Sequence, residues 1–351
     1  MLSKRFKYDG KPIIELNELQ LRIKNQIEKK IAENLYSFEK APCCICEGKN
    51  FEVLSEKDRY GLYVPVVICR DCGLIQTNPR MTQDAYNEFY DLEYRLLYME
   101  KKISTYEFFK SQYERGKRIY EYLEKFLGID LTNLKVLEVG AGAGGVLYYF
   151  KQKGNDVYGC DLGSEYVRFG REKYDLNLRV GTIDDIAINW NPDIVIYSHV
   201  LEHILNPVGE LVKLISICDH NHYLYIELPG VKYLNQSYGM NFLRLLQNAH
   251  VYYFTLATLK NVLGKSGYYF ICGNEIIRSI FKPSSSEEEN YESDYEDAIS
   301  FLKKMEFYRL LPTPYNIKRL TKPTIIWFLK CFGLYNLAKT AYERIIKKKL
   351  F

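Results

Sequence analysis

The first regular pattern in the chain is a run of hydrophobic residues spaced three and four apart between positions 13 and 38. Its members are Leu16, Leu19, Ile23, Ile27, Ile31, Leu35 and Phe38. This spacing is the period of a helix with one apolar face, and the positions between are rich in Glu, Lys and Gln. We therefore predict an amphipathic helix within residues 1–40. It would dock on the rest of the chain or on a second copy, which would give a homodimer.

A different pattern begins at Leu134, where short apolar runs that favour strands alternate with helical segments. The runs are KVLEVG, DVYGCD, DIVIYSH and HYLYIELPG. Such alternation is typical of βαβ units in a doubly wound parallel sheet. Residues 255–281 add a helix and a final pair of strands. We expect an α/β fold with a Rossmann-like sheet over residues 131–282, preceded by a Tyr-rich helical connector or lid over residues 83–130.

The composition changes twice after Pro283. Residues 284–297 carry seven acidic residues and four serines without one Lys or Arg, which predicts a flexible acidic linker over residues 283–300. Residues 312–351 carry nine Lys or Arg against the single acidic Glu343. We predict basic amphipathic helices over residues 301–351, which either contact an anionic membrane surface or pack on the protein itself.

The overall charge is small, because 48 Lys and Arg stand against 44 Asp and Glu. A formal net charge of +4 gives no strong signal for nucleic-acid binding. The N-terminus lacks an apolar signal region, and no stretch reaches the roughly 18 apolar residues of a membrane span. We expect a cytoplasmic protein whose tail contacts the inner membrane surface peripherally.

Four of the nine cysteines form two close pairs in the pattern C-x2-C-x22-C-x2-C. They are Cys43, Cys46, Cys69 and Cys72. Four thiolates complete a tetrahedral shell, so we expect a structural Zn2+ within a module of residues 41–82. Gly48 and Gly73 follow the two pairs, where tight turns require positive φ. Coincidental buried cysteines and a redox dithiol are the alternatives.

Glycines gather directly after the first strand of the predicted sheet, in the run GAGAGG at residues 140–145. Glycines let the backbone approach a ligand closely, and the next helix offers its N-terminus. Asp161 ends the following strand, where a carboxylate can accept hydrogen bonds from ribose hydroxyls. A dinucleotide and another nucleoside cofactor both fit this pattern.

Glu138 distinguishes between these cofactors. An acid two residues before the first glycine resembles motif I of class I S-adenosylmethionine-dependent methyltransferases, where it faces the methionine ammonium group. The segment SHVLEH at residues 198–203 resembles the same family after its fourth strand. The resemblance implies a seven-stranded methyltransferase sheet. It also implies a donor site made of Glu138, Gly140, Gly142, Gly144, Asp161, Leu162, Ile183, Asp184 and Ser198.

Residues 41–281 together resemble the zinc-containing methyltransferases of bacterial sugar and cell-surface glycan pathways. The features that carry this resemblance are the two cysteine pairs, a Tyr-rich stretch and the motif Gln112-x-x-Arg115-Gly. The resemblance implies S-adenosylmethionine as donor, zinc as structural metal, and a sugar, phosphosugar or nucleotide sugar as acceptor. Tyr90 and Tyr98, at helical spacing, are either a packed stripe or residues that close over the donor.

Methyl transfer requires alignment of donor and acceptor and often the removal of one proton, for which imidazole is the natural base. His199 and His203 follow the fourth strand and Glu227 ends the fifth, at the edge where such sheets bind ligands. His250 resembles the family's histidine after that strand. These four are the candidate catalytic residues, with packing as the alternative role. Sugar C-methyltransferases carry Tyr-x-Glu-His here, whereas Ala249 precedes His250, so we expect O-methylation, with N-methylation less favoured.

Two other functions remain open at this point. An RNA methyltransferase would also join a zinc module to this fold. However, the basic residues lie in the C-terminal tail and do not interleave with the cysteine pairs. A scaffold that binds the donor without transferring a methyl group would show the same donor motifs.

Overall fold

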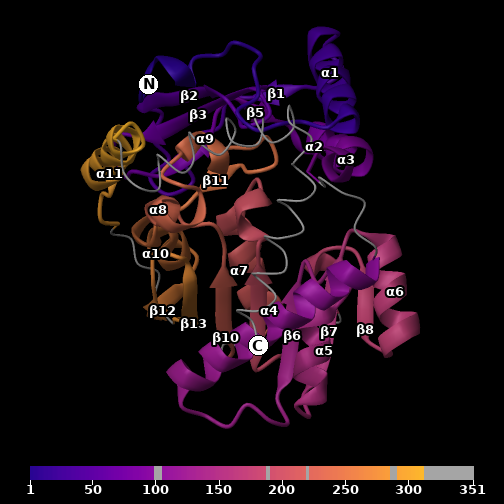
Figure 1. The fold of residues 1–351 in the computed structure, drawn as a ribbon. Helices are drawn as coiled ribbons and strands as arrows, with labels where there is room; N and C mark the ends of the chain where they lie inside the picture. Colours follow the sequence, from indigo (N-terminus) through magenta and orange to yellow (C-terminus); the bar gives the residue numbers. More distant parts are fainter. Residues whose placement is uncertain (99–104, 187–189, 219–220, 285–290, 312–351) are drawn as a thin grey trace, which may run out of the picture.

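The computed structural model describes residues 1–98, 105–186, 190–218, 221–284 and 291–311. Its centre is a seven-stranded sheet in the order β12-β13-β10-β9-β6-β7-β8 (Figure 1). The strands are β6 Lys135–Val139, β7 Asp156–Asp161, β8 Asn177–Val180, β9 Ile194–Ser198, β10 Tyr223–Glu227, β12 Tyr268–Gly273 and β13 Arg278–Pro283. Strands β6 to β10 run parallel to one another, and β13 runs antiparallel to β10 and β12. The predicted α/β fold and its final strand pair are confirmed.

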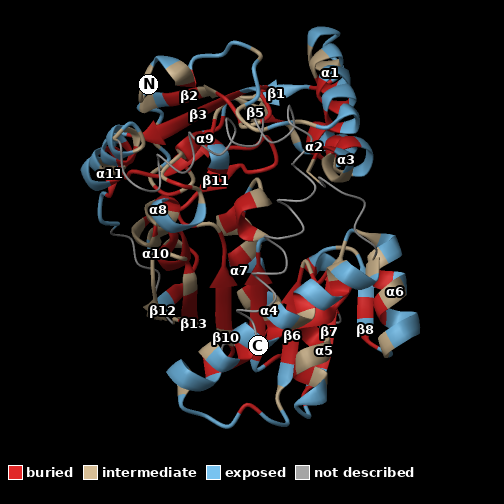
Figure 2. Cartoon of the chain, viewed as in Figure 1, coloured by how far each residue is buried: buried red, intermediate tan, exposed pale blue. Residues whose placement is uncertain are grey.

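Both faces of this sheet are covered, because its strands carry apolar side chains on alternate sides. Val136 and Leu137, neighbours in β6, belong to two different hydrophobic cores. One core contains residues of α4, α5 and α6, and the other contains residues of α7 and α10. The bounds are α4 Thr105–Leu127, α5 Gly145–Gln152, α6 Ser164–Tyr174, α7 Pro207–Ile217 and α10 Leu256–Lys265. Figure 2 shows buried strands at the centre and exposed outer faces on α4, α5 and α6.

A second, four-stranded sheet has the order β11-β4-β3-β2 and lies above the end of the large sheet to which β10 points (Figure 1). Its strands are β2 Phe51–Lys57, β3 Tyr63–Cys69, β4 Ile75–Thr77 and β11 Tyr252–Tyr253. The short strands β1 Phe38–Glu39 and β5 Arg80–Met81, which precede β2 and follow β4 in the chain, pair with each other. Because β11 follows β10 in the chain, the module expected at residues 41–82 is completed by a strand from the second half of the protein.

The helices that precede the large sheet hold the N-terminal segment in place. The amphipathic helix is α1 Glu18–Ala32, shorter than its hydrophobic pattern, and it begins at a capping box between Asn17 and Gln20. Gln20 donates from Nε2 to Leu97 O at 2.9 Å, so α1 docks on the connector of its own chain. The described residues of the connector are mostly helical. It consists of α2 Gln83–Phe89, a π-helix at Tyr90–Tyr94, α3 Arg95–Tyr98 and α4.

The predicted flexible linker is wrong in its second half, because α11 Tyr295–Tyr308 begins inside it. Asp294, which precedes this helix, is 5% exposed. It accepts from Thr255 Oγ1 at 2.6 Å and from Lys232 Nζ at 2.7 Å. An acidic residue that finds such partners is ordered rather than solvated. The basic tail, residues 312–351, lies outside the described residues.

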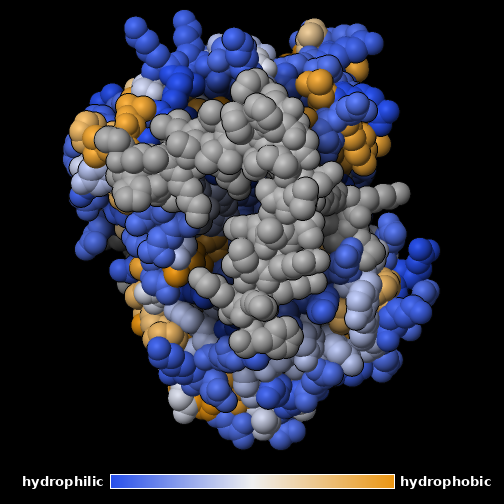
Figure 3. Space-filling model, viewed as in Figure 1, coloured by the Kyte–Doolittle hydropathy of each residue, from blue (hydrophilic) through white to orange (hydrophobic). Residues whose placement is uncertain are grey.

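Apolar side chains are exposed around α11, and Figure 3 shows hydrophobic atoms there and near α1 and α3, among mostly hydrophilic described side chains. Phe307 is 60% exposed and Leu310, just after the helix, is 68% exposed. Two further short helices, α8 Leu234–Ser237 and α9 Phe242–Leu245, complete the second half of the chain. No helix within the described ranges is long and apolar enough to cross a membrane.

Glu306 of α11 fastens the N-terminus to the C-terminal part, and its replacement should make stability less dependent on pH. Its carboxylate accepts from Arg5 at 2.6 and 2.7 Å and from Arg309 at 3.0 and 3.1 Å. Although burial raises the pKa of Glu306, these arginines lower it to about 2. The stabilisation is therefore present above the ordinary value of 4.5 and is lost as the pH falls towards 2.

Glu306→Gln should lower the free energy of unfolding by about 2 kcal/mol at pH 7, and by less at pH 3. Denaturant unfolding of both proteins at the two pH values measures this difference. An equal difference at both values would contradict the assignment.

Candidate active site and metal centre

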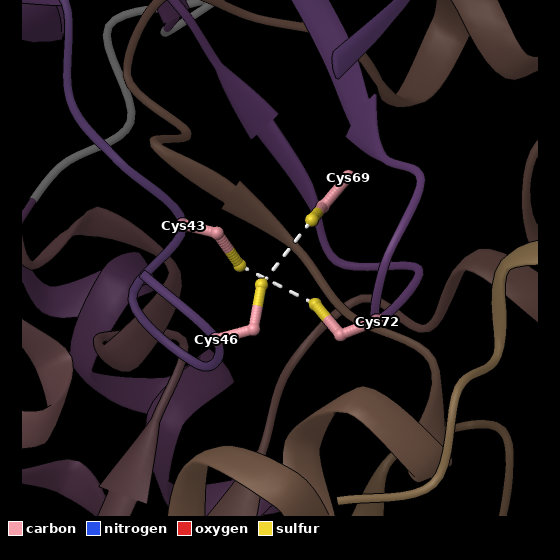
Figure 4. A group of neighbouring side chains, drawn as sticks. All are labelled: Cys43, Cys46, Cys69 and Cys72. Atoms are coloured by element: carbon pink, nitrogen blue, oxygen red, sulfur yellow. Dashed lines mark hydrogen bonds between the residues drawn. The ribbon is translucent and has the colours of Figure 1, made fainter. Parts of the chain in front are cut away.

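The four predicted metal ligands meet in the N-terminal sheet (Figure 4). Cys43 Sγ lies 3.3 Å from Cys72 Sγ, and Cys46 Sγ lies 3.4 Å from Cys69 Sγ. All four sulfurs are within 4.8 Å of one another, and three of the residues are buried. This set fits a tetrahedral ion with four Zn–S bonds of about 2.3 Å, a shell that leaves no position for water. Such an ion would stabilise the fold and take no part in catalysis.

The turn at the first cysteine pair differs from the prediction. Gly73 has φ +84° and its N–H donates to Cys69 O, as expected for the second turn. In the first turn the left-handed residue is Glu47, with φ +60°, and not Gly48. Glycine is needed at 48 for space, because a Cβ there would lie 2.5 Å from Asp71 Oδ2 and 3.2 Å from Cys46 Sγ.

The glycine run forms the turn between β6 and α5, at the carboxyl edge of the large sheet. Gly140, Gly142 and Gly144 all have positive φ, between +55° and +80°, a conformation that other residues rarely adopt. A Cβ on Gly140 would also collide with Val200. The glycines are therefore required both for the backbone conformation of this turn and for its close packing against neighbouring residues.

Two side chains hold the glycine turn in place. Asp161 accepts from the Gly142 N–H at 2.8 Å and from the Gly163 N–H at 2.7 Å. Gln112 of α4 donates to Ala141 O at 3.0 Å and accepts from the Ala143 N–H at 3.1 Å. Each carboxylate oxygen has a second acceptor site, so Asp161 still has capacity for ribose hydroxyls. Gln112 stands in the motif recognised from sequence, but its role in holding the turn emerges only from the structure.

Glu138 is almost completely buried in β6, with 2% exposure. Within the described residues, its Oε2 has no hydrogen-bond partner. Burial raises the pKa of Glu138 well above its ordinary value; Arg115 opposes this rise and Asp161 adds to it. Arg115 also donates to Ser198 Oγ at 3.4 Å. A buried carboxylate with an orphan oxygen beside the glycine turn fits a cationic ligand group such as an ammonium.

The remaining predicted site residues lie along the same edge but differ in their surroundings. Leu162 is 68% exposed beside Asp161, whereas Ile183 is 1% exposed. Asp184 forms an ion pair with Lys213 of α7. Glu227, at the end of β10, accepts from Arg278 Nε at 3.3 Å and from Tyr225 OH at 3.2 Å. The carboxylate of Glu227 is therefore paired with Arg278 and not with one of the candidate histidines.

The histidines gather around Glu202, a residue that the sequence motif contains but that we had not assigned to the site. Glu202 Oε1 lies 3.6 Å from His199 Nδ1 and 3.8 Å from His203 Nε2. Glu202 is 1% exposed, and neither of its carboxylate oxygens has a hydrogen-bond partner among the described residues. Burial raises the pKa of Glu202, but the neighbouring His199 and His203 outweigh burial and hold it below its ordinary value.

The three histidines have different environments. His199 has an exposed side chain, at 38%, and a left-handed backbone with φ +59°, a strain that is common at functional sites. His203 Nδ1 lies 2.8 Å from Ala249 O, and since a carbonyl only accepts, this nitrogen carries the proton. His250 is 5% exposed, and burial lowers its pKa well below the ordinary value. The rings of His203 and His250 lie 4.9 Å apart.

The tyrosine stripe packs against these histidines. Tyr90 OH lies 2.7 Å from His203 Nδ1, and Tyr98 OH accepts from the Ala249 N–H at 3.2 Å. Tyr90 and Tyr94, with ring centroids 4.5 Å apart, are contiguous with Tyr98. Burial raises the pKa of Tyr94 to about 12, and the charges of Glu202 and Asp161 add to the rise. Tyr94 therefore lies near both the histidine cluster and Asp161.

The N-terminal sheet forms one wall of the histidine cluster. Thr77 Oγ1 donates to His250 O at 2.9 Å, and Asp58 Oδ2 accepts from the Asn248 N–H at 3.3 Å. Arg59 donates to the side-chain oxygen of Gln247, whose amide nitrogen contacts His250 Nε2. Sequence reasoning missed Arg59 and Gln247 because no motif contains them. Only the structure shows their contact, because the N-terminal sheet places residues 58–77 against residues 247–253.

The comparisons agree with this geometry. Residues 111–272 match the sequence model of a family described as "Methyltransferase domain". The matched residues include the glycine turn, Asp161 and the histidines. The central part of the chain is therefore similar to this family of methyltransferase domains. None of the curated proteins matches the chain significantly.

Solved structures with similar folds include the magnesium protoporphyrin IX methyltransferase of Synechocystis PCC 6803 with bound SAH. It is 18% identical, with a TM-score of 0.39, over 58% of this chain and 98% of that chain. A TehB-like SAM-dependent methyltransferase from Corynebacterium glutamicum is 15% identical, with a TM-score of 0.33, over 50% of this chain and all of the other. At these TM-scores, neither protein bears on the acceptor.

Proposed function

We propose that the protein is an S-adenosylmethionine-dependent O-methyltransferase that acts on a sugar, phosphosugar or nucleotide sugar. The observation that carries the proposal is the arrangement at the carboxyl edge of the large sheet. There a glycine turn, an orphan buried acid and a ribose-binding acid adjoin a cluster of three histidines and a buried glutamate. The acceptor class rests on the resemblance of residues 41–281 to glycan-pathway methyltransferases.

Each group has a distinct task in this proposal. Glu138 would neutralise the donor's ammonium group and Asp161 would hold its ribose, which fixes the sulfonium at the glycine turn. The acceptor would lie beside the exposed side chain of His199, and its oxygen would attack the methyl carbon in line with the breaking C–S bond. His199, the histidine with the exposed side chain, is our assignment for the group that receives the acceptor's proton. The four cysteines would hold Zn2+ and keep the N-terminal wall folded.

Asp161→Asn should weaken donor binding by about tenfold or more, because it removes a charged acceptor from the ribose hydroxyls. Calorimetric titration with S-adenosylmethionine measures the affinity, and NADH serves as the competing ligand. Thermal unfolding of the same variant checks that the glycine turn, which Asp161 also holds, has survived. Binding of NADH alone to the parent protein would replace the methyl-transfer proposal with a dinucleotide one.

The acceptor class is tested by methyl transfer from labelled donor to a panel of nucleotide sugars, phosphosugars and RNA. Incorporation into a sugar hydroxyl supports the proposal. Incorporation into RNA alone would instead favour nucleic-acid modification. Tight donor binding with no transfer to any acceptor would favour a scaffold.

A further inference from the structure

We propose that Glu202, His203 and His250 form a second metal site, which binds a divalent transition-metal ion at the acceptor end of the active site. The site is distinct from the four cysteines and deepens the proposed function, on which its role in catalysis rests. One ligand atom from each of the three residues lies within 4.8 Å of the others. Two imidazoles and one carboxylate suit Zn2+ and its first-row neighbours, and three protein ligands leave positions open for substrate oxygen.

The buried carboxylate of Glu202 points independently to a cation. Both of its oxygens are buried without a hydrogen-bond partner among the described residues. Arg59 does not fill this role, because its guanidinium donates to a backbone carbonyl and to the side-chain oxygen of Gln247. The imidazoles of His199 and His203 lie 3.6 and 3.8 Å from Glu202 Oε1, and a buried carboxylate without a hydrogen-bond donor is costly unless a cation or a proton compensates it. An ion at this position would satisfy both oxygens.

His203 is already oriented as a metal ligand. Its Nδ1 lies 2.8 Å from Ala249 O, so in the neutral ring the proton is on Nδ1 and Nε2 carries the lone pair. A histidine that binds a metal through one ring nitrogen usually donates a hydrogen bond from the other, often to a backbone carbonyl. His203 Nε2 lies 3.8 Å from Glu202 Oε1, close to the separation of about 3.4 Å between two ligands of a tetrahedral ion with bonds of about 2.1 Å.

The backbone fixes His250 against the other two ligands. The Val251 N–H donates to Glu202 O at 2.8 Å, which joins the segment after β10 to the turn after β9. His250 Nε2 also meets the amide of Gln247. Ion binding therefore requires either that His250 uses Nδ1 or that Gln247 releases Nε2. In both cases the three ligand atoms, which lie within 4.8 Å of one another, must move closer together to bind one ion.

An ion here would act at the acceptor and not at the donor. The glycine turn, Glu138 and Asp161 surround a different part of the sheet edge, and Tyr94 is the residue whose charge surroundings include both Glu202 and Asp161. With three protein ligands in place, the open positions would take a hydroxyl oxygen of the acceptor. This gives the site selectivity for an acceptor with an oxygen next to the methylated position.

The test is a titration of the full-length protein, with its cysteine site loaded with zinc, using Co2+ as probe. We expect one further equivalent of Co2+ with a visible spectrum that lacks sulfur-to-cobalt charge transfer. Glu202→Gln and His203→Gln should each weaken this binding at least tenfold, because each removes one of three ligands. Glu227→Gln is the matched control at the same sheet edge, and Co2+ binding should be unchanged in it.

Two measurements distinguish failure of the proposed metal site from failure of the proposed methyl transfer. Calorimetry with S-adenosylmethionine should give the same donor affinity, within about twofold, in Glu202→Gln and the parent protein, and thermal unfolding confirms that the variant folds. Absence of a further Co2+ equivalent in the parent protein, or equal Co2+ binding in Glu202→Gln, would overturn the metal site. Retained donor binding in either case would leave the proposed methyl transfer standing. Loss of donor binding to the parent protein would overturn the proposed function instead.

Discussion

Cys69→Ser is expected to release the zinc ion, lower the melting temperature and reduce methyl transfer much more than donor binding. The reason is that the cysteine-bearing sheet is not a separate module. Strand β4 pairs with β11, and the Thr77 N–H donates to Val251 O at 2.8 Å, next to His250. Loosening this sheet removes the wall of the histidine cluster, while Glu138 and the glycine turn belong to the other sheet.

The expected loss of stability is at least about 2 kcal/mol, because structural zinc contributes its binding free energy to folding. Elemental analysis gives the zinc content, thermal unfolding gives the stability, and single-turnover methyl transfer is compared with calorimetric donor affinity. Cys44→Ser is the matched control, since Cys44 is adjacent in sequence but outside the four-sulfur group. Full zinc content and unchanged melting in Cys69→Ser would refute the ligand assignment.

The large sheet was predictable because its information is local. Each parallel strand is a short apolar run, and buried parallel strands need no partner residue to be recognised. The glycines, Asp161 and the SHVLEH segment follow strand ends directly, and parallel strands bring their carboxyl ends to one edge. The residues of the donor site therefore meet for topological reasons. The same holds for the cysteine pairs, whose spacing alone defines a four-ligand set.

The acceptor side was not predictable, because its contacts connect segments that are distant in the chain. Strand β11 has two residues, too few to show a period. Arg59 and Gln247 are 188 positions apart, and neither stands in a motif. Glu202 was visible in the sequence, but only its burial without a hydrogen-bond partner marks it as a ligand candidate. The linker prediction was wrong for a related reason, since the partners of Asp294 are Lys232 and Thr255.

The two metal sites proposed for this chain have different roles: one stabilises the fold and the other binds the acceptor. The cysteine site is a closed set of four sulfurs between the loops at the end of β3, so it can only stabilise the fold. The site at Glu202 has three ligands and adjoins the exposed side chain of His199, so it can admit an acceptor. Through Thr77 and His250 the first site positions the second. Zinc loss should therefore weaken Co2+ binding at Glu202, whereas Glu202→Gln should leave the cysteine site unchanged.

Donor binding is expected to release a proton from Glu138, and this should make donor affinity rise with pH. Burial raises the pKa of Glu138 well above its ordinary value, so below that raised pKa the free protein holds the carboxyl protonated. The donor's ammonium group favours the carboxylate and lowers the pKa in the complex. Affinity therefore increases as the pH rises towards the pKa of the free protein, by up to about tenfold per pH unit. The range from pH 5.5 to 7 keeps the donor's own amino group charged, since α-amino groups titrate near 8.

Calorimetry in two buffers with different ionisation enthalpies counts the protons released on binding. The parent protein should release up to one proton per donor within this range, and Glu138→Gln should release fewer while binding the donor about ten to a hundred times more weakly at pH 7. A nucleoside analogue of the donor that lacks the ammonium group is the matched ligand control, and its affinity should be independent of Glu138. The same proton release from Glu138→Gln as from the parent protein would assign the linkage to another group. Because Glu138 lies in the core of β6, thermal unfolding of the glutamine variant must accompany the titration. The isosteric amide keeps the packing of the strand, so a change in proton release without a change in melting isolates the charge.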